Sequence, residues 1–162
     1  MRFWQKQQLP KSNDGNAPSI TSGTSKVPMA ESLRKKAKVA IFDDVAEIIE
    51  AYSVFLGESE VCIVSREPVV SVSDALEVFR AERPDIVITD LSLTVGGTEG
   101  FDILDQIKAI APEVPVVLST SAYSHTSVDE ICVEIRAKGY DAVFEKRDGD
   151  GIAEFVMSRF SS

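Results

Sequence analysis

The sequence predicts an α/β protein in which helices cover both faces of a parallel sheet. Strand-like apolar runs alternate five times with amphipathic helical patterns, and the connections between them are short. The third run, Asp85–Asp90, is apolar on both faces, as is typical of a central parallel strand. At 162 residues the chain is long enough for one domain with its own core.

The predicted strands are short runs rich in β-branched residues. In chain order, they are Val39–Asp43, Val61–Val64, Asp85–Asp90, Val114–Thr120 and Tyr140–Lys146.

The predicted helices place apolar residues three and four positions apart. In chain order, they are Val45–Phe55, Asp74–Glu82, Phe101–Ile110, Val128–Lys138 and a final helix with Ile152, Phe155, Val156 and Phe160 on one side. Residues that end helices follow the first four: Gly57, Pro84, Pro112 and Gly139. Ser127 and Glu130 have capping-box spacing, which predicts the start of the fourth helix there.

Charge divides the chain into two parts. Residues 1–38 hold 8 Lys/Arg against 2 Asp/Glu, whereas residues 39–162 hold 9 against 24. Residues 1–36 also lack apolar periodicity, so we expect a disordered basic tail there and a single folded domain over residues 37–162. An acidic domain repels phosphate backbones, so nucleic-acid binding is not expected, whereas divalent-cation binding is compatible with it.

Membrane insertion and export are not expected either. No apolar run approaches the roughly 20 residues that cross a bilayer, and the first residues lack a signal-peptide core, so we expect a cytoplasmic protein. Cys62 and Cys132 both lie in apolar patterns, which predicts two buried free thiols rather than a disulfide.

Chemically useful residues stand at the carboxyl ends of four of the five predicted strands: Asp43, Asp44, Asp90, Thr120 and Lys146. The carboxyl ends of parallel strands meet at one edge of a sheet, so these side chains are expected in one pocket. Carboxylates there could hold Mg²⁺, and one could act as a nucleophile towards a phosphoryl group. A hydroxyl could bind a phosphoryl oxygen, and an amine could offset its charge. Each residue alone is compatible with a cap, a turn, a strand end or a surface charge; their joint occurrence favours a phosphoryl-transfer site.

Four segments carry a family resemblance. KVAIFDD, PDIVITD, VPVVLST and GYDAVFEK resemble, in order and spacing, the receiver domain of response regulators in two-component signalling. The resemblance covers residues 38–160 and implies a flavodoxin-like (βα)5 doubly wound sheet with strand order 2-1-3-4-5. It implies that a sensor histidine kinase or a phosphotransfer protein phosphorylates Asp90, with Thr120 as the switch hydroxyl and Lys146 as the family lysine.

The same resemblance implies a metal site and a mode of action. Mg²⁺ would be bound by Asp44, Asp90 and the backbone carbonyl of Ser92, with Asp43 acting through water. The protein would be a phosphoacceptor rather than a turnover enzyme. We expect a stand-alone receiver that signals by protein contact, since no output domain follows Phe160. Homodimers through the face of the fourth helix are common in the family, and the sequence leaves the oligomeric state open.

Three departures from the family pattern concern the loops around the site. Leu93–Thr94 replaces the usual Met-Pro, and Gly100 comes about two residues late. Lys146–Arg147 replaces the usual Lys-Pro, so we expect a trans peptide bond there. Val143 occupies the aromatic switch position, and the neighbouring Phe144 is out of phase with it on a strand.

These departures keep other classes open. The chain could be a pseudo-receiver, an interaction module that works without phosphorylation. An aspartate-nucleophile hydrolase is not expected, because the second acid it needs would stand at Ser92. His125, the single histidine, is expected at the surface.

Overall fold

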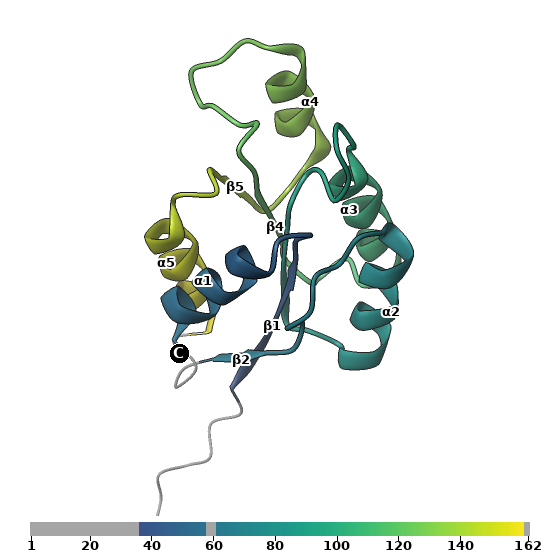
Figure 1. Ribbon diagram of the computed structural model, residues 1–162, viewed down its shortest axis with the longest axis vertical. Coiled ribbons are helices and arrows are strands. Elements are labelled where there is room, and N and C mark those ends of the chain that lie inside the picture. The colour runs from purple at the N-terminus through teal and green to yellow at the C-terminus, as the bar shows by residue number, and fades with distance from the viewer. Residues whose placement is uncertain (1–35, 58–60, 161–162) are drawn as a thin grey trace, which may run out of the picture. The chain divides into compact units, whose positions relative to one another are not determined.

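The computed structural model of the chain describes residues 36–57 and 61–160, and these residues form a five-stranded parallel sheet with helices on both faces (Figure 1). The strands are β1 (Ala37–Phe42), β2 (Val61–Ile63), β3 (Ile86–Thr89), β4 (Val116–Ser119) and β5 (Ala142–Phe144). The helices are α1 (Ala46–Leu56), α2 (Val72–Glu82), α3 (Glu99–Ile110), α4 (Glu130–Lys138) and α5 (Gly149–Phe160).

The strand order is β2-β1-β3-β4-β5, and every neighbouring pair is parallel. The predicted fold class and strand order are therefore confirmed. The predicted tail falls at residues 1–36, of which 1–35 lie outside the described residues.

Alternation along the strands builds a core on each face of the sheet. From β1, Val39 and Ile41 pack in one cluster with residues of α1 and α5, while Ala40 and Phe42 pack in another with residues of α2 and α3. A third cluster joins the end of β4 to α3 and α4. In Figure 1, α1 and α5 lie together on one side of the sheet, and α2 and α3 on the other. No described helix is long and apolar enough to cross a membrane.

The start of the fourth helix was predicted wrongly. Residue Asp129 is the N-cap of α4, not Ser127, whose hydroxyl oxygen accepts a hydrogen bond from the Asp129 N–H at 3.1 Å. The Arg136 guanidinium donates to the carbonyl oxygens of Ser124, His125 and Ser127. The Arg136 bonds and the Ser127 hydroxyl bond together hold the segment before α4 as a loop. Hydroxyl-to-backbone turns of this kind compete with helix formation.

The prediction that both thiols are buried is correct for Cys132 and wrong for Cys62. Strand β2 lies at the sheet edge, where Val61 and Ile63 face the core and the residue between them faces solvent. Both cysteines are free thiols.

Candidate functional site

The parallel pairing of β1 and β3 brings the first two acidic positions together. Phe42, the last residue of β1, lies beside Thr89, the last residue of β3. The next residues, Asp43 and Asp90, therefore leave the sheet side by side, and the Asp90 N–H donates to the Phe42 carbonyl at 2.8 Å. Both carboxylates are buried, with residue exposures of 2% and 7%. Asp44, the next residue along, is exposed.

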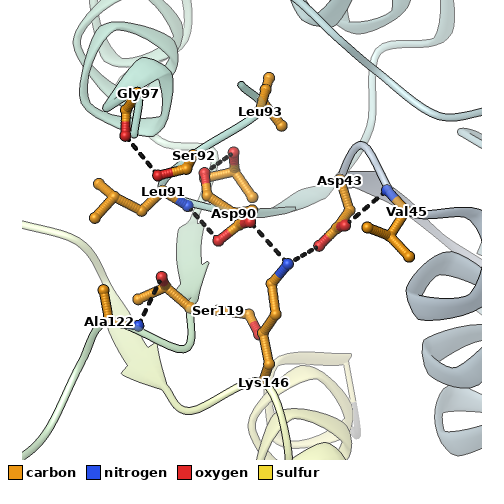
Figure 2. Close-up of polar contacts among 12 residues, drawn as sticks. Asp43, Val45, Asp90, Leu91, Ser92, Leu93, Gly97, Ser119, Ala122 and Lys146 are labelled. Atoms are coloured by element: carbon orange, nitrogen blue, oxygen red, sulfur yellow. Dashed lines mark hydrogen bonds and ion pairs between the residues drawn. The ribbon is translucent and has the colours of Figure 1, made fainter. Parts of the chain in front are cut away.

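Lys146 follows β5 and connects these two carboxylates (Figure 2). Its Nζ lies 2.9 Å from Asp43 Oδ2 and 2.7 Å from Asp90 Oδ2. The remaining carboxylate oxygens accept backbone hydrogen bonds, Asp43 Oδ1 from the Val45 N–H at 3.0 Å and Asp90 Oδ1 from the Leu91 N–H at 2.7 Å. Both acids are therefore held in fixed orientations, as pre-organised chemistry requires.

Burial and charge pairing set the protonation of this centre. Burial raises the pKa of the Asp43 carboxyl above its ordinary 3.8, although Lys146 opposes the rise. Burial alone would lower the pKa of Lys146, but its bonds to Asp43 and Asp90 outweigh that effect and raise the pKa above 10.5. Lys146 is therefore a cation at neutral pH.

The donor set fits a small divalent cation. Asp43, Asp44 and Asp90 each offer one carboxylate oxygen, and these oxygens all lie within 4.8 Å of one another. Hard cations such as Mg²⁺ prefer carboxylate, carbonyl and water oxygens and keep several waters, which an exposed acid beside two buried ones allows. Three carboxylates around one ammonium group also leave an excess of negative charge.

The predicted hydroxyl lies at the same edge of the sheet but has a different partner. Thr120 directly follows β4 and is buried, with its N–H donating to the Phe144 carbonyl at 3.0 Å. Its Oγ1 accepts a hydrogen bond from the Ala122 N–H at 3.3 Å. This side-chain hydrogen bond lies within the loop after β4, whereas Lys146 contacts both buried acids.

Ser92, the predicted backbone ligand, lies two residues beyond Asp90. Its hydroxyl donates to the Gly97 carbonyl, so the loop after Asp90 folds back on itself (Figure 2). Gly100, at the start of α3, lies against this segment and donates its N–H to the Leu91 carbonyl at 2.8 Å. A Cβ at Gly100 would overlap the Asp90 carbonyl oxygen, which explains why a glycine occupies this position.

Sequence reasoning missed Tyr52 as part of the site. Its buried hydroxyl donates to the Lys146 carbonyl at 3.2 Å and pairs with the Ser119 hydroxyl. Burial raises the pKa of Tyr52, so the neutral phenol is the form present at neutral pH. The pattern of α1 marked this residue as apolar core, and nothing in that spacing indicates a partner 94 residues away.

The packing of β5 shows the departure from the family at the aromatic switch position, where this chain has Val143. Val143 packs against the cluster around Leu118 and Tyr123, while Phe144 packs on the opposite face, with its ring 6.1 Å from that of Phe155. The two side chains are out of phase, as predicted.

His125 is exposed and shares a hydrogen bond with the Tyr123 hydroxyl at 2.9 Å. The trans bond between Lys146 and Arg147 stays a prediction.

Comparisons with known proteins agree with this geometry. The family model of the response regulator receiver domain matches residues 39–146. A curated relative, the methanol utilization control regulatory protein MoxX of Paracoccus denitrificans, is 23% identical over 83 residues. That alignment covers 51% of this chain and 36% of the relative, so the chain spans little more than a third of the relative's length.

Solved structures share the fold. A CheY-like response regulator receiver domain protein from Methanospirillum hungatei JF-1 superimposes with a TM-score of 0.62 at 18% identity, covering 78% of this chain and 94% of that one. The receiver domain of NtrX from Brucella abortus gives 0.58 at 24% identity, covering 75% and 95%. The resemblance read from the four motifs is confirmed, and the chain belongs to the response regulator receiver domain family.

Proposed function

We propose that this chain accepts a phosphoryl group on Asp90 from a sensor histidine kinase or a histidine phosphotransfer protein, in a reaction that depends on Mg²⁺. The observation that carries the proposal is the Asp90 carboxylate itself, held by Lys146 beside Asp43 with Asp44 within metal-binding reach. Aspartate phosphorylation and Mg²⁺ binding are typical of the family.

The transfer is a simple displacement. A carboxylate oxygen of Asp90 forms a bond to phosphorus while the bond from phosphorus to the donor imidazole nitrogen breaks. That nitrogen keeps the electron pair, and the imidazole leaves as a neutral ring when its other nitrogen carries a proton. Lys146 stays protonated and can pair with the new phosphoryl oxygens.

Asp44, Asp90 and the Ser92 carbonyl would hold Mg²⁺, with Asp43 acting through water. When bound, Mg²⁺ supplies positive charge that would stabilise the negatively charged phosphoryl oxygens beside this cluster of acids.

Readout of the phosphoryl group would involve Thr120. Its hydroxyl oxygen accepts from the Ala122 N–H, which leaves the hydroxyl proton available to donate to a phosphoryl oxygen on Asp90. Val143 packs where the family has an aromatic switch, so we propose that the response passes through the loop after β4 rather than through a rotating ring. A local charge change of this kind can bias a two-state element.

The remaining features of the proposal concern context. Receiver domains are signalling domains rather than turnover enzymes, and we propose direct protein contact in the cytoplasm as the output of this chain. If this chain forms homodimers, we expect them through the face of α4, as the family resemblance implies.

Intact-mass analysis with acetyl phosphate tests the proposal. The wild-type chain should gain one phosphoryl group in the presence of Mg²⁺ and none after chelation, and Asp90→Asn should gain none. The opposite result, Mg²⁺ binding without any gain of mass, would leave a pseudo-receiver that acts as an interaction module.

A further inference from the structure

The loop between β3 and α3 is organised around one carboxylate, that of Glu99. Its Oε2 accepts a hydrogen bond from the Leu93 N–H at 3.1 Å, and its Oε1 accepts one from the Thr94 hydroxyl at 2.5 Å. The hydrogen bond from the Thr94 hydroxyl lowers the pKa of Glu99, so the carboxylate is charged at neutral pH. Glu99 thus ties the start of α3 to the residues that follow Asp90.

A glycine makes room for this carboxylate. A Cβ built on Gly97 would overlap both carboxylate oxygens of Glu99. The backbone of Gly97 lies outside the left-handed region, so the glycine is needed for space and not for conformation. Its N–H donates to the Thr94 carbonyl at 3.0 Å, and its carbonyl accepts from the Ser92 hydroxyl, which closes the loop.

The Leu93 N–H belongs to the same peptide unit as the Ser92 carbonyl. A trans peptide is planar, and its N–H and C=O point in opposite directions. By accepting from the Leu93 N–H, Glu99 therefore sets the direction in which the Ser92 carbonyl points. The preceding peptide is fixed as well, because the Leu91 N–H donates to Asp90 Oδ1 at 2.7 Å.

We propose that Glu99 is a positioning residue that orients the Ser92 carbonyl towards the divalent cation. The inference rests on the proposed function, since it takes Ser92 as a ligand of the Mg²⁺ that phosphorylation needs. Outer partners of metal ligands typically change metal affinity 10–100-fold when removed. The loop after Asp90 departs from the family pattern, and the Glu99 side chain at the start of α3 holds it in place.

Four variants of the full-length chain separate geometry from charge. Glu99→Ala removes both hydrogen bonds and the charge. Glu99→Gln removes the charge but can still accept from the Leu93 N–H and donate to the Thr94 hydroxyl. Gly97→Ala keeps every charge while displacing the flexible carboxylate. Glu113→Ala, at an exposed position in the connection that leads into β4, is the matched control for net charge.

The first readout is the affinity for Mg²⁺, measured by titrating each variant and recording the chemical shifts of its backbone amides. Glu99→Ala and Gly97→Ala should each weaken Mg²⁺ binding about tenfold, whereas Glu99→Gln should stay within about threefold of wild type. The control Glu113→Ala should match wild type. Equal weakening by Glu99→Ala and Glu99→Gln would show that Glu99 acts only through its charge, and no weakening by Glu99→Ala would show that it does not act on the metal; either result overturns the proposal.

Hydrogen exchange of the Leu93 amide without metal gives the second readout. Exchange should accelerate in Glu99→Ala and Gly97→Ala and stay slow in Glu99→Gln, because only the first two lose the acceptor. Unchanged exchange in Gly97→Ala would overturn the proposed contact, and this variant also carries the test if Glu99→Ala does not fold.

The outcomes distinguish this inference from the proposed function. A wild-type chain that binds Mg²⁺ but gains no phosphoryl group contradicts the proposed function alone, and the affinities of the variants still decide the role of Glu99. A wild-type chain that binds no Mg²⁺ contradicts both.

Discussion

At the scale of single residues, one ammonium group holds two buried carboxylates at the centre of the site. Lys146 contacts both Asp43 and Asp90, and its own side chain is 16% exposed. A carboxylate left buried without a partner is costly, so the three groups depend on one another. The charge on the lysine therefore contributes to the stability of the site without metal.

Replacing this lysine tests that dependence. Lys146→Met should lower the free energy of unfolding by about 3 kcal/mol without metal, because two buried carboxylates lose their cation. Saturating Mg²⁺ should restore part of the loss, since a bound cation stabilises the folded state. Urea denaturation with and without Mg²⁺ measures both effects.

Lys138→Met is the matched control, because Lys138 pairs with a carboxylate that is 59% exposed, that of Asp105. A surface pair of this kind contributes about 0–1 kcal/mol. Equal losses in the two variants would contradict the coupling of Lys146 to the site.

Tyr52 forms a hydrogen bond to the backbone of this lysine. Tyr52→Phe removes the donor to the Lys146 carbonyl and the partner of the Ser119 hydroxyl, and should lower the free energy of unfolding by about 1–2 kcal/mol. Urea denaturation measures the difference, and a variant as stable as wild type would show that the phenol contributes packing alone.

At the scale of elements, an ion pair at the amino ends of the strands, the ends away from the candidate site, connects α3 to β4 and β5. Lys108 in α3 lies 2.8 Å from Asp141, which directly precedes β5 and accepts from the Val116 N–H of β4 at 2.8 Å. Burial alone would raise the pKa of Asp141, but the Lys108 and Val116 bonds outweigh it and hold the pKa below its ordinary 3.8. Because the folded-state pKa is depressed, the contribution to stability is present above 3.8 and is lost as pH falls through the folded-state value.

Asp141→Asn measures this contribution. The variant should be about 1 kcal/mol less stable than wild type at neutral pH, discounted for the partial exposure of both side chains. The difference should shrink as the pH falls below 3.8. Thermal unfolding of both chains across this range gives the comparison, and a difference that grows on acidification would contradict the assigned direction of the pKa shift.

At the scale of the whole molecule, parallel pairing explains why the sequence predicts so much of the site. Once five strands run in the same direction, residues that follow them must meet at one edge, so Asp43, Asp90 and Lys146 could be grouped across about a hundred residues. The contacts that orient these groups could not be predicted in this way. Tyr52 looks like core on its helix, and Glu99 looks like an ordinary acid in the first turn of a helix.

Local patterns also misled where a competing contact intervened. The spacing of Ser127 and Glu130 satisfies a capping box, yet Arg136 binds the carbonyls before α4 and keeps Ser127 in a loop. Cys62 lies between two apolar residues, but its strand is an edge. Both errors concern contacts between segments, which a pattern along one segment does not contain.

The most direct test of the whole proposal locates the phosphoryl group on the chain. After reaction with acetyl phosphate and Mg²⁺, borohydride reduces an aspartyl phosphate to homoserine, which peptide mass spectrometry identifies by position. We predict homoserine at residue 90 and unmodified aspartate at residues 43 and 44. Homoserine at residue 43 or 44, or none at residue 90 in a chain that binds Mg²⁺, would contradict the assignment of Asp90 as the phosphoacceptor.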